Sequence, residues 1–210
     1  MIDALTDSIV RIHDLGGPVV LVLLGLSVIA LTVIAYKLWQ FSAAGVGRHK
    51  ALRSAVTAWD QGDMDRARSD IAKSRSYLCP VVAAAFDGNA DYDRLAAEAE
   101  TRFAGLERGF RLLDTIAQLA PLLGLFGTVL GMISAFQALQ DAGTQVDPSV
   151  LAGGIWVALL TTAVGLAVAM PVASILSWFE ARMDAERVLA ERALRTTLSP
   201  ARAQTVPTHA

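Results

Sequence analysis

Cysteine and histidine are scarce in this chain, which has one cysteine and three histidines among 210 residues. Because Cys79 has no second cysteine to pair with, an intrachain disulfide is excluded. His13, His49 and His209 lie far apart in the sequence and do not show the ligand spacing of a metal site. The sequence also lacks a glycine-rich phosphate loop and a set of nucleophile, base and acid. We therefore expect no metal, no cofactor and no enzymatic activity.

Charge is also scarce, at 18% of the residues against 54% that are hydrophobic. Two long stretches, Thr115–Gln140 and Pro148–Phe179, carry no charge, and a third apolar stretch runs from Val19 to Tyr36. Each is long enough to cross a hydrocarbon core, which needs roughly 20 residues of helix. The sequence therefore predicts an all-α membrane protein with three transmembrane helices and long cytoplasmic helical extensions.

The few charges are distributed unevenly. Arg11 is the only basic residue before the first apolar stretch, and the residues between the second and third include Asp141 and Asp147 but no Lys or Arg. Basic residues are retained on the cytoplasmic side of a membrane, so we expect the N-terminus and the short second loop to face outward. An acidic N-terminal region is atypical of a cleaved signal peptide, and the first span should stay as an anchor. The predicted order is an outward N-terminus (1–17), span one (18–38), a cytoplasmic helical domain (39–111), span two (112–140), a periplasmic loop (141–150), span three (151–179), a cytoplasmic helix (180–198) and a disordered tail (199–210).

Local signals place helices in the cytoplasmic segment. We expect helices at 47–59, at 64–74 after an Asp63 cap, and at 80–86. Asp91 is a candidate N-cap for the longest helix, whose apolar positions continue at helical spacing into span two. After span three, Arg182 and Glu186, Arg187 and Glu191, and Glu191 and Arg195 are spaced as solvated i,i+4 pairs. Since acidic and basic residues are mixed here, nucleic-acid binding is not indicated.

Small residues and threonines lie along one face of spans two and three. In lipid, Gly and Ala let helices approach closely, so we expect helix packing, within a subunit or between subunits, at Gly124, Gly127, Gly131, Gly154, Ala158, Gly165 and Ala169. We expect the hydroxyls of Thr128, Thr162 and Thr161 to line a polar passage. The sequence leaves one alternative open: a threonine hydroxyl can return its hydrogen bond to its own helix.

Two sequence motifs carry a resemblance. The segments APLLGLFGTVLGMISAF (Ala120–Phe136) and GGIWVALLTTAVGLAVAMP (Gly153–Pro171) resemble the two signature spans of the MotA/TolQ/ExbB proton channel family, close to its ExbB and TolQ branch. The three-span layout and the long insertion after the first span also match. The resemblance implies a multi-pass protein of the bacterial inner membrane that converts proton motive force into work for protein transport or a related process.

The resemblance also implies partners. It implies a pentamer of this chain in membrane lipid around a dimer of a one-span ExbD-like or TolR-like protein, which acts on a TonB-like or TolA-like protein. The pore threonines of the family fall on Thr128 and Thr162, whereas Val157 stands where several members carry a glutamate. A proton crossing a bilayer needs an ionisable group, and the stretches Thr115–Gln140 and Pro148–Phe179 have none, so the partner must supply an intramembrane Asp. The alternative is a membrane scaffold without ion conduction.

Overall fold

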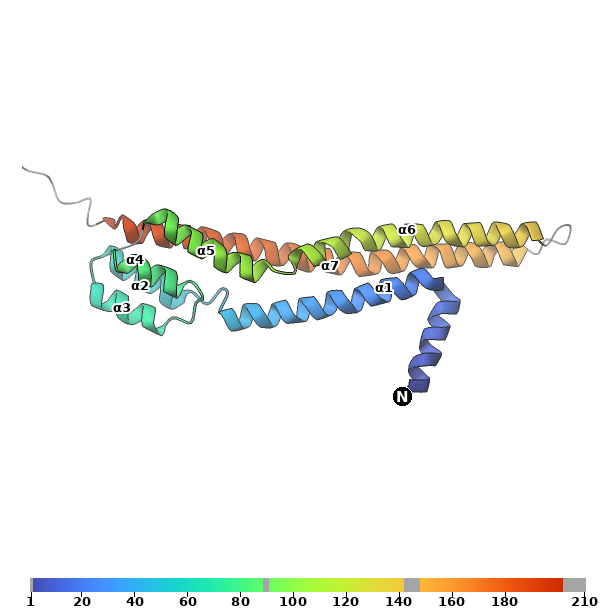
Figure 1. Cartoon of the computed structure of the whole chain (residues 1–210), viewed down its shortest axis with the longest axis horizontal. Helices are drawn as coiled ribbons and strands as arrows, with labels where there is room; N and C mark the ends of the chain where they lie inside the picture. Colours follow the sequence, from blue (N-terminus) through green and yellow to red (C-terminus); the bar gives the residue numbers. More distant parts are fainter. Residues whose placement is uncertain (1, 89–90, 142–147, 202–210) are drawn as a thin grey trace, which may run out of the picture. The chain divides into compact units, whose positions relative to one another are not determined.

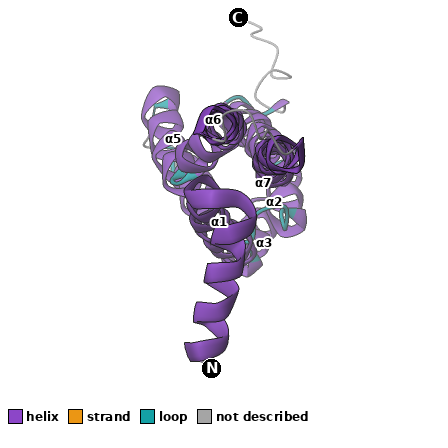
Figure 2. Cartoon of the chain, turned by 90° about the vertical axis from the view of Figure 1, so that its right-hand side faces the viewer, coloured by secondary structure: helices purple, strands orange, loops and turns teal. Residues whose placement is uncertain are grey.

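The computed structural model describes residues 2–88, 91–141 and 148–201, and within these the side chains from Gly17 onward except those of Pro148 and Val150. Within these residues the chain is helical and contains no strand, which confirms the predicted all-α class (Figure 2). The helices, labelled in Figure 1, are α1 (Ile2–Ala44), α2 (Lys50–Asp60), α3 (Met64–Lys73), α4 (Cys79–Phe86), α5 (Tyr92–Glu107), α6 (Phe110–Asp141) and α7 (Pro148–Leu198). The predicted periplasmic loop and tail lie mostly outside the described residues. The chain divides into two compact units.

Unit 1 contains α1 up to Ala35, all of α6 and α7 up to Ser177. In Figure 1 α6 runs beside the first half of α7. Val19 and Leu23 of α1 are buried against Ala120 of α6 and Ala169 of α7. Two of these four side chains are alanines, so the three helix backbones approach closely at this point.

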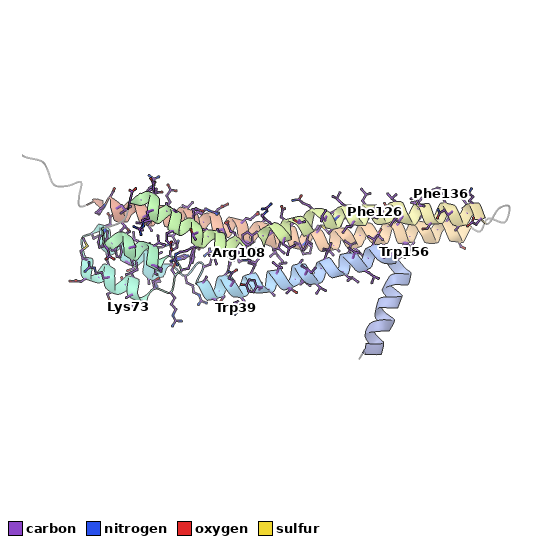
Figure 3. The ribbon with its side chains drawn as sticks, in the orientation of Figure 1. Trp39, Lys73, Arg108, Phe126, Phe136 and Trp156 are labelled. Carbon is purple, nitrogen blue, oxygen red and sulfur yellow. The ribbon has the colours of Figure 1, made fainter. Side chains whose placement is uncertain are left out.

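Three helices are long and apolar enough to cross a membrane, as predicted. They are Gly17–Ala44, Phe110–Asp141 and Leu151–Leu198, judged by length and composition among the described residues. Large apolar side chains cover their outer surfaces: Phe126, Phe136 and Trp156, labelled in Figure 3, are 53%, 56% and 64% exposed. Such surfaces suit lipid or neighbouring membrane helices rather than water.

Figure 1 shows a bend within α1, and the backbone of this helix is non-helical at Gly17. Gly17 has φ 66° and ψ −172°, a conformation that side chains with a Cβ rarely adopt, and Pro18 follows it. A proline disfavours helical geometry in the preceding residue. The Gly-Pro pair therefore separates the N-terminal helical turns from the membrane-spanning part of α1.

Unit 2 contains the end of α1, helices α2 to α5 and the C-terminal half of α7. The predicted caps are confirmed: the Asp63 carboxylate accepts a hydrogen bond from the backbone N–H of Arg66, and that of Asp91 from Tyr92. The hairpin of α2 and α3 turns at Gly62, which has φ 85°. The Trp59 ring stacks on Phe86 with centroids 4.3 Å apart, which ties α2 to α4.

The prediction of one unbroken helix from Asp91 into span two is wrong. Helix α5 ends at Glu107, Arg108 has φ −52° and ψ 127°, and Gly109 has φ 95° before α6 begins at Phe110. A positive φ cannot be part of an α-helix, so Gly109 divides the apolar series between two helices. The longest helix is instead α7, with 51 residues.

Candidate functional site

Helices α6 and α7 approach closely at glycines, where an added Cβ would meet the backbone of the other helix. A Cβ placed on Gly165 would lie 2.6 Å from the carbonyl oxygen of Ala120, and one on Gly124 would lie 2.9 Å from that of Thr161. Both distances are shorter than real Cβ contacts. At this level the two helices leave no room for a side chain on either glycine.

The same pattern continues toward the C-terminal end of α6 and the N-terminal end of α7. Gly127 faces the Thr161 side chain, Gly131 faces Ala158, and Gly154 faces Ala135. Ala158 and Ala169 are 4% and 6% exposed. The structure thus places all seven residues expected at helix contacts where the helices of one chain meet.

Thr161 lies inside this contact. Its Oγ1 donates to the carbonyl oxygen of Ala158 (2.7 Å) and is also within 3.2 Å of the Gly124 carbonyl oxygen, and the residue is 1% exposed. Within the chain, this hydroxyl holds α7 against α6 and is shielded from any passage on the outer surface.

Thr162 and Thr128 are only half-buried. Thr162 Oγ1 donates to the Gly124 carbonyl oxygen at 3.3 Å, and Thr128 Oγ1 donates to the Leu125 carbonyl oxygen of its own helix at 2.6 Å. Thr128 also lines a shallow groove of about 490 Å³ with Met132, Phe136 and Gln137. Each hydroxyl uses its single hydrogen in these bonds but keeps oxygen lone pairs that can accept one.

Val157 lines a cleft of about 310 Å³ between the Gly17 bend, α6 and α7. Ser134 and Thr161 supply the polar side chains of its lining, and the described residues around it include no ionisable group. The chain therefore offers no carboxylate at the position where the resemblance would put one.

A buried polar cluster in unit 2 was not predicted from the sequence. The side chains of His49 and Glu186, 3% and 2% exposed, are in contact, with His49 Nε2 2.6 Å from Glu186 Oε2. The Glu186 carboxylate also accepts hydrogen bonds from the backbone N–H of Gly47 (3.1 Å) and from the Tyr77 hydroxyl (3.0 Å), while Ser76 Oγ lies 3.0 Å from His49 Nδ1. The prediction that Glu186 lies on a solvated helix surface is wrong, because these partners bury it.

The electrostatics of this cluster favour a charged carboxylate. Burial raises the pKa of Glu186, but the hydrogen bond and charge of His49, the Tyr77 hydroxyl and the charge of Arg182 together bring that pKa below its usual 4.5. Burial and the neighbouring carboxylate raise the pKa of Tyr77, which therefore remains a hydrogen-bond donor. The cluster joins the segment after α1, the loop before α4 and α7.

Lys37 is a second buried charge, 1% exposed near the end of α1. Its Nζ donates to the carbonyl oxygen of Leu106 (2.8 Å) and to Gln40 Oε1 (2.7 Å). Leu106 is in the last turn of α5, where a cation is favoured by the helix dipole. Lys37 thus fixes the end of α5 against α1.

Among the described residues, no group of three potential metal ligands occurs.

The chain is thus a helical membrane protein whose second and third spans pack through glycines and carry threonines, with no ionisable residue in Thr115–Gln140 or Pro148–Phe179. It belongs to the MotA/TolQ/ExbB proton channel family. The sequence pattern of this family matches residues 73–192, which are more than half of the chain. It is similar to proteins of the ExbB and TolQ branch, and its three candidate spans agree with a multi-pass inner-membrane protein.

Three relatives illustrate the similarity. The putative biopolymer transport protein ExbB-like 1 of Synechocystis sp. is 36% identical over 165 residues, which cover 74% of this chain and 64% of the relative. The biopolymer transport protein exbB1 of Vibrio cholerae is 49% identical over 63 residues, 30% of this chain and 28% of the relative. The Tol-Pal system protein TolQ of Haemophilus influenzae is 40% identical over 80 residues, 38% of this chain and 35% of the relative. The chain therefore spans less than two thirds of the length of these relatives.

Proposed function

We propose that this chain is the channel subunit of an inner-membrane complex that converts proton motive force into mechanical work. The observation that carries the proposal is the pairing of a glycine-packed α6 and α7 with half-buried threonines and no ionisable residue from Thr115 to Gln140. Intramembrane acids and bases are costly and occur where they are used. A chain without them can shape and hydrate a passage but cannot itself bind and release a proton.

The carboxylate that carries the proton comes from a partner. We assign this role to an intramembrane Asp of a one-span protein like ExbD or TolR, whose movement acts on a protein like TonB or TolA. Several copies of this chain, five by family resemblance, surround the partner. Each proton that moves inward across 100 mV releases about 2.3 kcal/mol, enough to bias a rotation or shift of the partner.

The three threonines take different parts in this proposal. Thr128 and Thr162 present hydroxyl oxygens with free acceptor capacity to the partner's protonated carboxyl group or to water beside it. Thr161, whose hydroxyl is buried between α6 and α7, instead holds the two spans together. The N-terminus and the loop after α6 face the periplasm, and the segments rich in Lys and Arg face the cytoplasm.

The test replaces each hydroxyl by a methyl group. Thr128→Val and Thr162→Val nearly preserve side-chain shape, so they separate polarity from packing. We expect each variant to keep the oligomer size while proton flux with the partner in reconstituted vesicles falls about two- to tenfold, since a hydrogen bond contributes about 0.5–1.5 kcal/mol. Full flux in both variants would refute the assignment of these residues to the passage.

Thr161→Val serves as the matched control. It exchanges a hydroxyl for a methyl group on the same helix, one residue from Thr162, but inside the contact with α6. We expect reduced thermal stability, with flux per folded complex close to that of the wild type. The hydrogen bond of Thr128 to its own helix favours the alternative of a scaffold without ion conduction. That alternative predicts no partner-dependent proton flux in the wild type or in any of the three valine variants.

A further inference from the structure

Unit 2 has an open groove between α2 and the C-terminal half of α7, with a volume of about 550 Å³. Its apolar floor includes Val56, Leu189 and Val188, the last of which is 66% exposed. Its charged lining residues are Arg53, Arg192 and Asp60, so the two arginines outnumber the one carboxylate. Within the described part of the chain neither guanidinium group makes a hydrogen bond or an ion pair, unlike Arg187 and Arg195. An apolar floor with two unpaired arginines fits an amphipathic, acidic helix.

Helix α5 of the same chain has such a surface. The exposed residues Asp93, Ala97, Glu100 and Ala104 recur at intervals of four, three and four, so they form one stripe along the helix, which we name the α5 ridge. The two alanines permit close approach, and the two carboxylates are about 10 Å apart at 1.5 Å per residue. Asp93 makes no ion pair within the described residues, whereas Glu100 lies 3.4 Å from Arg187.

The groove and the ridge lie on different sides of α7. Leu189 faces the groove, whereas the Arg187 guanidinium lies over the Phe103 ring of α5 (5.4 Å). Positions two residues apart on a helix point roughly 160° away from each other. The ridge of one chain therefore cannot enter its own groove, whereas that of a second chain can.

The two surfaces also lie at the same level along α7. The Arg195 guanidinium lies over the Tyr92 ring (5.4 Å) at one end of α5, and Arg187 lies over Phe103 further along. The ridge thus covers the level of residues 187–195, and the groove lining extends from Ala185 to Thr196. Copies arranged around an axis parallel to α7 would bring Asp93 of one chain to the level of Arg192 of the next.

We propose that the groove between α2 and α7 binds the α5 ridge of a second copy of this chain, head to tail. Two different surfaces on opposite sides of a subunit make a heterologous contact, which forms a ring when the rotation from copy to copy closes. The inference rests on the homo-oligomer in the proposed function and assigns it a contact in unit 2. Exposed ion pairs add little affinity, so the arginines set the register while the apolar floor provides most of the burial.

Disulfide cross-linking tests the contact. In a Cys79→Ala background, the double variant Ala97→Cys and Val188→Cys places one thiol on the ridge and one in the groove. We expect oxidation to give a ladder of several chains on a denaturing gel, because a head-to-tail contact continues from copy to copy. A matched control replaces Ala97→Cys by Ser69→Cys, at an exposed position of α3 off the ridge, and should give no ladder.

A charge exchange tests the register. Arg192→Glu and Asp93→Arg should each reduce the cross-linked fraction severalfold, and the two together should restore it. A ladder that stops at dimers would overturn the head-to-tail arrangement. Absence of cross-links from a complex that keeps its native mass and proton flux would overturn the contact and leave the proposed function standing. A full ladder without flux would support the contact and refute the proposed function.

Discussion

The contact of Gly165 with the backbone of α6 allows a quantitative prediction for Gly165→Ala. The added methyl carbon would lie 2.6 Å from the carbonyl oxygen of Ala120 and 3.1 Å from the Cα of Gly124, where ordinary contacts begin at 3.4 Å. Both neighbours are backbone atoms, which cannot rotate away. The helices must therefore separate by about 0.8 Å along the shorter contact, the difference between 2.6 and 3.4 Å.

Two energy terms oppose each other in this variant. Overpacking typically costs about 1–3 kcal/mol, and replacing glycine by alanine within a helix gains about 1 kcal/mol. The net expected change in the free energy of unfolding lies between no change and a loss of about 2 kcal/mol. Gly153→Ala is the matched control, because a Cβ there would meet nothing within 4 Å. It should be stabilised by up to about 1 kcal/mol.

The assay compares the two variants in one detergent, by unfolding in sodium dodecyl sulfate followed through helical circular dichroism. We expect the free energies of unfolding of the two proteins to differ by about 1–3 kcal/mol, with Gly165→Ala the less stable. Equal stabilities would mean that α6 and α7 are not in backbone contact at Gly165, and the packing described here would be refuted.

Two further predictions concern assembly and pH. Gly131→Leu should prevent the chain from forming a detergent-stable oligomer, measured by size exclusion, because a Cβ at Gly131 would already lie 3.2 Å from that of Ala158. Val129→Leu, at a side chain 49% exposed, should leave oligomer formation intact. The reverse result would mean that the packing face is misassigned. Because the pKa of Glu186 is lowered in the folded state, its contribution to stability is complete above its usual pKa of 4.5 and is lost as the pH falls through the folded value. Glu186→Gln should therefore melt at a lower temperature than the wild type at pH 7, with a difference that shrinks below about pH 4.5; a constant difference would exclude the charged carboxylate as its cause.

Features that depend on neighbouring residues could be predicted from the sequence. The Asp63 and Asp91 caps each bond a backbone N–H within three residues, so local composition suffices to identify them. The spans could be predicted because a hydrocarbon core excludes charge over a fixed length. The break at Gly109 was missed because apolar spacing reports which face of a helix is buried, and that spacing continues across the break.

Features that depend on distant residues could not be predicted. Glu186 has an arginine four residues before it, and this pattern is typical of an exposed helix pair. Its actual partner, His49, is 137 residues away in the sequence and lies in a loop beside α2. Only the fold brings them together, and the direct contact with His49 Nε2 at 2.6 Å outweighs the Arg182 contact at 3.5 Å.

The threonines show the same limit at the candidate site. Thr161 and Thr162 are adjacent and both place Oγ1 near the Gly124 carbonyl oxygen, at 3.2 and 3.3 Å. Successive helical residues point about 100° apart, so one threonine enters the contact with α6 while the other stays half-buried. The helical period gives the angle between the two side chains, but it does not tell which of the two threonines faces α6. That depends on Gly127, whose missing side chain leaves the space that Thr161 fills. A larger residue at Gly127 would therefore displace Thr161 and leave the Thr162 hydroxyl in place.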